Sequence, residues 1–448
     1  MDEQSYDPSE EISLEQALDM AVDFHRQGRL DEAVALYAQI LEAAPNHGPT
    51  LTLAGACRLQ QGDEEQALGL LDAALASGYG ATELRHNRAM VLKAMGRLEE
   101  AVREFERALD ADPGRLSSLY NLANTLRELG ETAKAKDRYM ELLEINPVHT
   151  DALVNLSRLL ESEGETEEAL ALAQGAADTN AAAGHLRLGQ ILERLGRYQE
   201  AEQAFLDCLE LTPDDALGAG LHLARLRGTA PDKAPDGFVA TLYDQYAERF
   251  DDHLTSSLSY RGPETLALAL AERLAPDASL DVLDIGCGTG LCGSALRPYA
   301  ERLHGVDLSE KMLGKAAKRK IYDLLESAEA EAYLAAHPES FDLAAAIDTF
   351  LYAGDLHSVI RAAASSLRPG GLFIFTVESG EKAFELTGDM RYAHSEDHLR
   401  DCASAAGLEI AAIDEISLRT DAGEPVDSLM AVLQKPVERN CVLKQPIR

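Results

Sequence analysis

A run of apolar residues leads into a turn in which every second residue is glycine. Residues 281–290 read Asp-Val-Leu-Asp-Ile-Gly-Cys-Gly-Thr-Gly, so that Asp284 precedes Gly286, Gly288 and Gly290. A second apolar run ends in Asp307, 23 residues after Asp284. Glycine lets the backbone approach a ligand closely, and an acid at the end of the second strand accepts hydrogen bonds from ribose hydroxyls. The pattern therefore predicts a nucleotide site at the carboxyl edge of a parallel sheet.

The spacing of the glycines separates two classes of nucleotide site. A dinucleotide fold has Gly-x-Gly-x-x-Gly, whose third glycine packs the helix on the strand, but counted from Gly286 that position is Leu291. The third glycine comes one residue earlier, at Gly290, and an acid precedes the loop. Asp-x-Gly-x-Gly-x-Gly resembles the first motif of class I S-adenosylmethionine (SAM) methyltransferases. A nicotinamide enzyme is therefore the weaker interpretation, and the position of Asp307 disfavours a glycine turn without a ligand.

The elements around this turn alternate between helix and strand. An alternating order with apolar strands predicts a doubly wound (Rossmann-like), mainly parallel α/β sheet that binds its ligand at the carboxyl ends of the strands. A final hairpin-like pair would match the antiparallel last strand of class I methyltransferases. The predicted strands are 279–285, 302–307, 341–348, 372–378, 409–419 and 428–434, with helices at about 263–274, after the glycine loop, from Ser309 and near 395–406.

Aromatic residues precede the sheet at helical spacing. Tyr243, Tyr246 and Phe250 lie at i, i+3 and i+7 within the predicted helical segment 238–262, which puts them on one face of a helix. Two interpretations stay open for this face. It packs against the domain, or it forms a lid whose rings close over the cofactor and exclude water.

The first half of the chain is a repeat array. Alanine recurs at intervals of 34, 34, 34, 34 and 32 residues, each time five residues after a glycine, and proline closes four of the units. This is the pattern of tetratricopeptide (TPR) repeats, which are helical hairpins of 34 residues. Small alanines let the two helices approach, glycine makes the turn, and proline stops the second helix. The phased alanines are Ala33, Ala67, Ala101, Ala135, Ala169 and Ala201.

The two patterns together define an organisation for the chain. An all-α TPR solenoid precedes the α/β domain, and the solenoid presents a concave face that binds a protein or peptide ligand, or serves as a spacer or dimerisation element. The predicted parts are an acidic N-terminal segment (1–13), six repeats (14–215), a capping helix (216–228), a linker (229–237) and the methyltransferase domain (238–448), with its lid helix at 238–262.

Composition excludes several other classes of protein. The formal net charge of −36 argues against general affinity for nucleic acid or for an anionic membrane surface. No apolar run reaches the ~18 residues that a membrane span needs, and the acidic N-terminus is unlike a signal peptide. Six cysteines without a Cys-x-x-Cys pair predict free thiols in a reducing cytoplasm and no metal site.

Several further stretches extend the resemblance over most of the chain. They are Tyr-Asp-Gln-Tyr-Ala-Glu-Arg-Phe-Asp, Gly-Val-Asp-Leu-Ser-Glu-Lys-Met-Leu, Phe-Asp-Leu-Ala-Ala-Ala-Ile-Asp, Leu-Arg-Pro-Gly-Gly-Leu-Phe and Arg-Tyr-Ala-His-Ser. The whole resembles the bacterial family of TPR-repeat-fused, class I SAM-dependent methyltransferases. The resemblance implies SAM as cofactor and methyl transfer as reaction, and it implies no substrate.

The resemblance also implies roles for individual residues. Asp284 and the glycine loop would hold the methionine end of SAM, and Asp307 would accept the ribose hydroxyls, with Leu308 beside the adenine. Glu329 is the candidate for the adenine amino group. The alternative for each strand-end acid is a helix cap.

Residues near the reacting methyl group are less sharply predicted. Asp348 ends the fourth strand, where methyl transfer occurs in the family, and Tyr352 and His394 are candidates to contact substrate. No residue is predicted as a general base, because one is needed only when the acceptor must lose a proton. The acceptor stays open between a protein side chain and a small molecule, and between oxygen and nitrogen. The alternative to an enzyme is a TPR scaffold whose SAM-binding domain is catalytically inactive.

Overall fold

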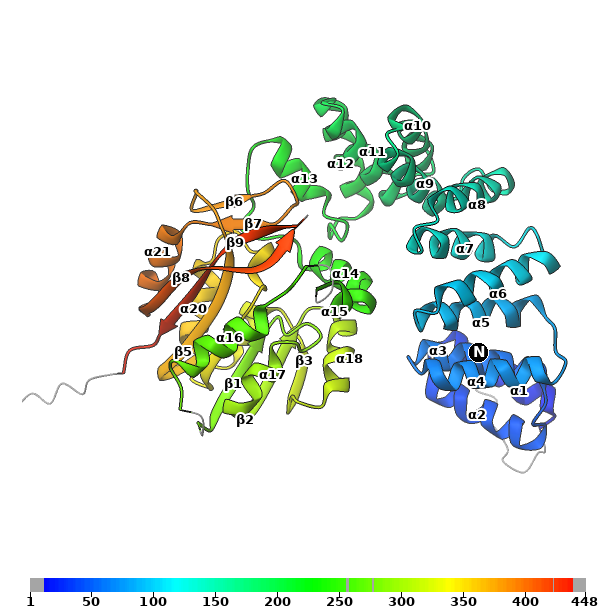
Figure 1. The fold of residues 1–448 in the computed structure, drawn as a ribbon, viewed down its shortest axis with the longest axis horizontal. Helices are drawn as coiled ribbons and strands as arrows, with labels where there is room; N and C mark the ends of the chain where they lie inside the picture. The colour runs from blue at the N-terminus through cyan, green and yellow to red at the C-terminus, as the bar shows by residue number, and fades with distance from the viewer. Residues whose placement is uncertain (1–11, 255–257, 276–277, 422, 438–448) are drawn as a thin grey trace, which may run out of the picture. The chain divides into compact units, whose positions relative to one another are not determined.

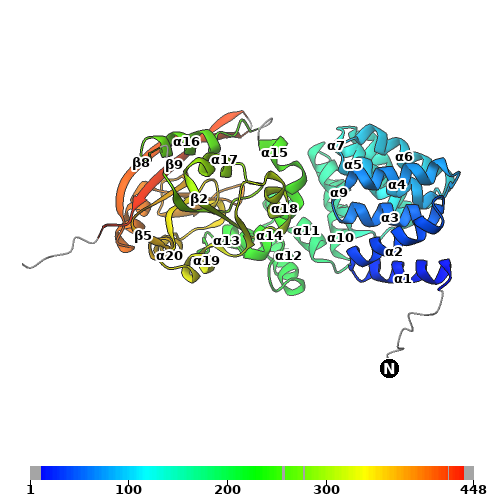
Figure 2. The same ribbon diagram turned by 90° about the horizontal axis from the view of Figure 1, so that it is seen from below.

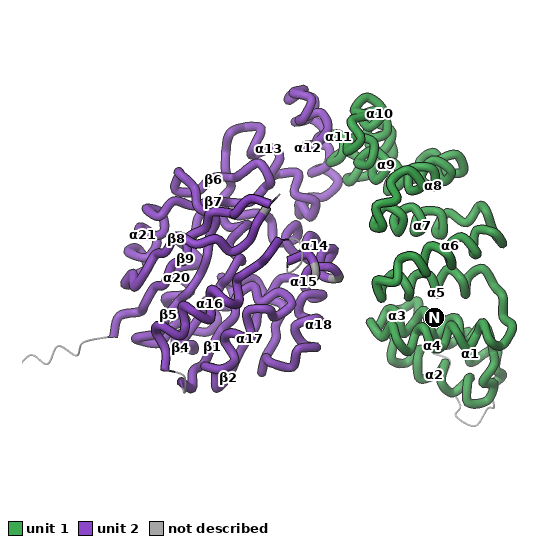
Figure 3. Tube along the Cα trace, in the orientation of Figure 1, with its two compact units in different colours: residues 1–188 green, residues 189–448 purple. Residues whose placement is uncertain are grey.

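The computed structural model describes residues 12–254, 258–275, 278–421 and 423–437. The chain divides into two compact units, residues 1–188 and residues 189–448 (Figure 3). Of the predicted parts, most of the N-terminal acidic segment, residues 255–257 of the lid segment and residues 438–448 lie outside the described ranges.

The first unit consists of helices that follow one another in pairs (Figure 1, Figure 2). Each pair is one predicted repeat. The helices are α1 (Leu14–Arg26), α2 (Leu30–Ala43), α3 (Gly48–Gln60), α4 (Glu64–Ala76), α5 (Thr82–Ala94), α6 (Leu98–Ala111), α7 (Leu116–Glu128), α8 (Thr132–Ile145), α9 (Thr150–Ser162) and α10 (Thr166–Ala177); α11 (Ala182–Arg194) extends across the division between the units.

The phased residues have the environments that the repeat pattern predicts. All six phased alanines are fully buried, and so are the large residues four positions later, such as Phe105 and Phe205. The glycine that precedes each alanine has a positive φ, between 72° at Gly96 and 85° at Gly164. Only glycine adopts this region without a steric penalty. The helices therefore turn where the sequence predicts, and the array is a TPR solenoid.

The second unit begins inside the sixth predicted repeat and includes its second helix. Helix α12 (Tyr198–Leu211) is followed by α13 (Ala219–Leu226), within the segment predicted as a capping helix. The ring of His222 on α13 stacks on Phe205 with the centroids 4.6 Å apart. Residues of the predicted linker bond to the α/β domain, since the N–H of Ala234 donates to the carbonyl oxygen of Tyr352 at 2.8 Å.

The remaining residues form a doubly wound sheet. Its parallel strands lie in the order β3-β2-β1-β4-β5, and β9 is antiparallel to both β5 and β8. The predicted antiparallel final pair is confirmed. The strands are β1 (Leu280–Ile285), β2 (Ala300–Asp307), β3 (Leu324–Ser327), β4 (Phe341–Ala346), β5 (Leu367–Ser379), β6 (Phe384–Leu386), β7 (Tyr392–His394), β8 (Glu409–Asp421) and β9 (Glu424–Gln434).

Helices cover both faces of the sheet (Figure 1). One core cluster joins the sheet to α19 (Ala330–Ala336), α20 (His357–Ser366) and α21 (Glu396–Ala405). The other joins it to α16 (Gly262–Ala271) and the short α17 (Gly293–Leu296). Helix α14 (Asp236–Tyr246) packs against α18 (Glu310–Arg319), which begins directly after β2. Among the described residues, no helix combines the length and apolarity of a membrane span.

Candidate active site

A cavity of about 940 Å³ lies at the carboxyl ends of β1, β2 and β4. Small-molecule sites typically have volumes of ~300–1,000 Å³, so this cavity is large enough for a cofactor together with a small acceptor. Its lining includes most of the residues that the sequence predicts: Asp284, Gly286, Gly288, Asp307, Leu308, Glu329, Asp348, Tyr243, Tyr246, Phe250 and Tyr352.

Two predicted residues are not part of this lining. Gly290 has φ 86°, and a Cβ there would lie 2.9 Å from the Tyr322 ring, so this glycine makes room for packing beneath the loop. His394, a candidate for substrate contact, is fully buried and bonds through Nε2 to the carbonyl oxygen of Gly354 at 2.8 Å. Burial lowers the pKa of His394 to about 4.

The first two glycines of the loop shape the floor of the cavity. Gly286 has φ 63°, and a Cβ there would lie 2.3 Å from Cγ2 of Thr349. Gly288 has φ 54°, and a Cβ there would meet only the ring of Phe250, at 3.8 Å. The backbone at Gly288 is therefore open toward the cavity, as close approach to a ligand requires.

Asp284 is buried at the end of β1, with 2% of its surface exposed. The hydroxyl of Tyr322 donates to its Oδ2 at 2.6 Å. Burial raises the pKa of Asp284 to about 7, although the Tyr322 hydrogen bond opposes the shift. Because a buried carboxylate attracts a cationic group strongly, this position favours a positively charged ligand.

Asp307 joins the end of β2 to the glycine loop. Its Oδ2 accepts the N–H of Gly288 at 2.8 Å, and its Oδ1 accepts the N–H of Ser309 at 2.9 Å. Burial raises the pKa of Asp307, and these N–H donors oppose the shift. A carboxylate oxygen has more than one acceptor position, so both oxygens can still accept hydroxyl donors from the cavity.

Asp348 follows β4 with a positive φ of 58°, which is unusual for a residue other than glycine. It forms an ion pair with Arg419, which also pairs with Glu378. Arg391 lies at the same wall, 3.6 Å from Glu378. The sequence predicts Asp348 but not the two arginines. The signal in the sequence was a basic residue next to each of two late strands, since Arg391 directly precedes β7 and Arg419 lies near the end of β8.

The predicted lid segment contacts both the glycine loop and α18. The ring of Phe250 lies 5.2 Å from Tyr246 and 6.1 Å from Tyr243 between centroids. The hydroxyl of Ser309 donates to Asp244 at 2.5 Å, and Thr289 donates to Asp251. The aromatic stripe therefore packs on itself and also lines the cavity, and its closure over a cofactor stays a prediction.

Glu329 is the N-cap of α19. Its Oε2 accepts the N–H of Ala332 at 2.7 Å, and its Oε1 lies 3.5 Å from the ammonium of Lys233. It also lines the cavity. Glu329 can therefore cap α19 and still contact a ligand in the cavity.

Comparisons with known proteins agree with both halves of this description. Residues 283–375 match a family model described as a methyltransferase domain. Tetratricopeptide repeat models match residues 24–86, 81–147, 120–183 and 182–215.

Curated relatives match about a third of the chain. A ubiquinone biosynthesis O-methyltransferase of Thiobacillus denitrificans is 35% identical over 157 residues, which are 34% of this chain and 67% of the relative. A protein of the same description from Aromatoleum aromaticum is 30% identical over 148 residues, 32% of this chain and 63% of the relative. The chain spans about half to two thirds of the length of such relatives.

A solved structure described as a SAM-dependent methyltransferase from Mesorhizobium loti has a TM-score of 0.31 and 23% identity, covering 39% of this chain and all of the other.

Three findings define the class of the protein. They are the matches to the family models, the identity to the curated relatives and the order of the strands in the sheet. The chain belongs to the class I SAM-dependent methyltransferases, in a form fused to an N-terminal array of TPR repeats.

Proposed function

We propose that the cavity at the carboxyl ends of β1, β2 and β4 binds SAM and that the enzyme transfers its methyl group to an oxygen of a small organic acceptor. The observation that supports SAM binding most directly is the geometry of Asp307. Its two carboxylate oxygens are fixed by backbone N–H groups of the glycine loop and of the start of α18, and they line the cavity.

The charges of the cavity suit this cofactor. SAM has a cationic sulfonium centre and an ammonium group, and Asp284, Asp307 and Asp348 line the cavity. Asp284 lies where the family holds the methionine end, and its burial raises the cost of leaving its charge without a partner. A cationic ligand would stabilise the ionised carboxyl.

Methyl transfer itself requires alignment and exclusion of water more than acid–base chemistry. The acceptor oxygen would form a bond to the methyl carbon as the carbon–sulfur bond breaks, the electron pair would stay on sulfur, and the hydroxyl proton would pass to solvent. The rate would therefore depend on holding acceptor, methyl group and sulfur in line. The rings of Tyr243, Tyr246 and Phe250 form an apolar wall that would exclude water from this line.

Two observations support an oxygen acceptor of small size. The curated relatives at 30–35% identity are described as O-methyltransferases of ubiquinone biosynthesis. The wall formed by Tyr243, Tyr352 and Phe250 suits a flat apolar molecule, since aromatic rings pack edge to face and offset against one another.

SAM binding can be tested with a pair of aspartate substitutions. Asp307→Ala removes the hydrogen bonds from Gly288 and Ser309 and the proposed ribose acceptor, and we expect isothermal titration calorimetry to detect no SAM binding. Asp323→Ala is the control, because Asp323 also accepts a backbone N–H, from Leu303 at 2.8 Å, and does not line the cavity. Equal SAM affinity of the two variants would reject the assignment of Asp307.

Transfer of a labelled methyl group tests the acceptor. The full chain is incubated with methyl-labelled SAM and a cell extract separated into protein and small-molecule fractions, and we expect label in the small-molecule fraction. Label only in protein would reject a small acceptor. SAM binding without transfer to either fraction would favour the catalytically inactive scaffold.

We propose that the TPR array binds a protein partner that brings the enzyme to its place of action. TPR arrays bind extended peptides or partner domains along their concave face. Deletion of residues 1–181 retains α11 and the whole second unit. The truncated enzyme should keep its SAM affinity and its transfer to the isolated acceptor, while losing association with partners in co-purification.

A further inference from the structure

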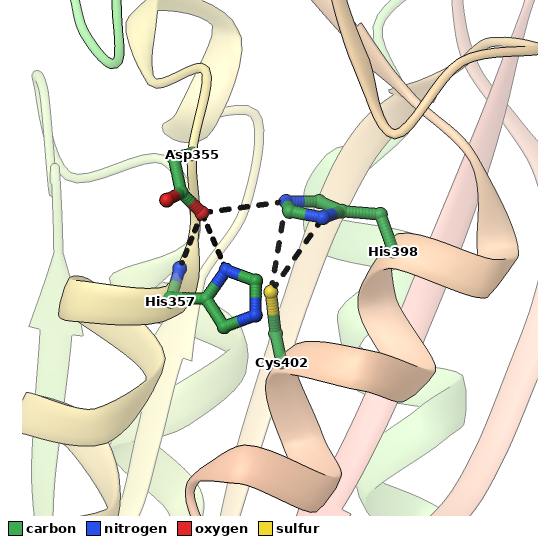
Figure 4. A group of neighbouring side chains, drawn as sticks. All are labelled: Asp355, His357, His398 and Cys402. Carbon is green, nitrogen blue, oxygen red and sulfur yellow. Dashed lines mark hydrogen bonds and ion pairs between the residues drawn. The ribbon is translucent and has the colours of Figure 1, made fainter.

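Four side chains able to bind a metal ion converge beside the cavity (Figure 4). They are Asp355, His357, His398 and Cys402, and one ligand atom of each lies within 4.8 Å of those of the other three. Asp355 and His357 belong to the turn that begins α20, and His398 and Cys402 belong to α21. The sequence predicts no metal site because it contains no Cys-x-x-Cys pair, and these four residues come together only in the fold.

We propose that these four residues bind one divalent transition-metal ion of the zinc class. Zinc sites in proteins take thiolate, imidazole and carboxylate ligands, usually four in number and tetrahedral. One sulfur, two imidazole nitrogens and one carboxylate oxygen match this preference. Calcium and magnesium are disfavoured, because they take oxygen ligands almost exclusively.

Two of the separations between the ligand atoms match those of a tetrahedral site. Metal–ligand bonds of ~2.0–2.3 Å place tetrahedral ligand atoms about 3.3–3.8 Å apart. The Sγ of Cys402 lies 3.6 Å from Nε2 of His398, and that nitrogen lies 3.8 Å from Oδ1 of Asp355. The Nδ1 of His357 is closer to Asp355, at 2.6 Å, so this hydrogen bond must lengthen when an ion enters. Both side chains are partly exposed and can rotate toward the cavity to make this change.

The local elements hold the ligands in place before any ion binds. His398 and Cys402 are four residues apart in one helix, so they share a face. The N–H of His357 donates to Asp355 at 3.1 Å, and the N–H of Asp355 donates to the carbonyl oxygen of Asp232 at 2.9 Å. Preorganised ligands reduce the entropy that binding must overcome.

Burial gives the site one protected and one accessible side. Cys402 is fully buried and His398 is 5% exposed, whereas Asp355 and His357 are partly exposed and line the cavity. Zinc-class ions bind cysteine as the thiolate, so the proton of the Cys402 thiol passes to solvent when the ion enters.

An ion at this position would join two parts of the domain that the chain separates by about forty residues. The loop that contains Asp355 forms part of the cavity wall, and α21 packs on the sheet behind it. The metal would therefore fix the cavity wall to α21. This inference does not depend on the identity of the methyl acceptor.

Cobalt substitution provides the test, using the full chain freed of metals and titrated with Co²⁺. We expect one equivalent per chain, a thiolate-to-cobalt charge-transfer band and the intense visible bands of tetrahedral Co²⁺. Cys402→Ser should remove the charge-transfer band. Cys57→Ser is the matched control, because Cys57 is also buried but lies in the repeat array, where its thiol contacts the carbonyl oxygen of Leu30; this variant should keep the band.

A second variant distinguishes loss of metal binding from loss of folding. His357→Ala changes a partly exposed side chain and should weaken Co²⁺ binding at least tenfold without changing the circular dichroism spectrum. Zn²⁺ should raise the Tm of the wild-type chain and displace Co²⁺ stoichiometrically. The proposal is overturned if Co²⁺ gives no charge-transfer band, if the band persists in Cys402→Ser, or if His357→Ala binds Co²⁺ as tightly as the wild type.

Discussion

The burial of Asp284 should make the methyltransferase unit less stable as the pH rises. The pKa of this carboxyl is raised from 3.8 to about 7, so the folded chain retains a proton that the unfolded chain has lost. Stability falls with rising pH wherever the folded state binds more protons. The loss therefore occurs between pH 3.8 and pH 7 and is complete above pH 7. We predict that Asp284→Asn, which keeps the shape and an acceptor for the Tyr322 hydroxyl, removes this loss.

The size of the effect follows from the shift. About three pKa units correspond to about 4 kcal/mol at high pH, and about 2 kcal/mol of this arises between pH 5.5 and pH 8. For a unit of this size, 1 kcal/mol changes the Tm by roughly 2–4 °C. Asp284→Asn should therefore gain about 4–8 °C relative to the wild type on going from pH 5.5 to pH 8. It should also bind SAM more weakly, because an amide has no charge to attract the cationic ligand.

Differential scanning calorimetry at both pH values measures the effect on the transition that shifts with SAM. Asp281→Asn in the same strand is the control. Asp281 pairs with Arg302 at 2.6 Å and with Arg368 at 2.8 Å, and the Arg302 hydrogen bond lowers its pKa to about 2. Its contribution is constant between pH 5.5 and pH 8 and is lost only as the pH falls toward 2. If the wild type and Asp284→Asn had the same difference in Tm between the two pH values, the reasoning would be wrong.

Three further predictions concern the lid, the buried arginine and the array. Asp244→Ala removes the lid's hydrogen bond to the start of α18, and stopped-flow fluorescence should show SAM dissociating about tenfold faster with an unchanged Tm. Arg419→Met leaves Asp348 and Glu378 without this partner, which should lower the stability in urea unfolding by about 3–5 kcal/mol. Unchanged stability would mean that water reaches these carboxylates. Ala101→Leu overpacks a fully buried helix contact and should destabilise the repeat unit by about 1–3 kcal/mol, while calorimetric SAM affinity stays at the wild-type value.

The sequence predicted those features that depend on residues close to one another in the chain. The repeat phase follows from one glycine and one alanine per unit, and each acts within its own turn. The glycine loop and Asp307 were predictable because both lie where a strand ends, and parallel strands bring their carboxyl ends to one edge. The mainly parallel, doubly wound sheet follows from the alternation of helices and strands, and the antiparallel final pair was predicted from the resemblance to class I methyltransferases; the order of the strands was not predicted.

Features assembled across the sheet were not predictable from spacing. Arg419 lies 71 residues from Asp348 and 41 from Glu378, and only the pairing of β8 with β9 and of β9 with β5 brings them together. The cluster at Asp355 and His398 likewise requires α20 and α21 to pack on one face. His394 was predicted as a candidate to contact substrate because it stands in a conspicuous motif, but packing buries it away from the cavity.

The uniform turns of the array have a consequence for how its length can change. Gly62 and Gly96 have φ of 74° and 72°, and the residue after each donates its N–H to a carbonyl five positions back, at 2.9 Å and 2.8 Å. Removal of residues 63–96 would join Gly62 to Arg97 and recreate the junction that Gly96 already makes. Between Gly28 and Gly164 the turn glycines repeat every 34 residues, so this part of the array can gain or lose modules of that length with every remaining turn unchanged. A deletion of 33 or 35 residues within it would shift the phase of the helices that follow.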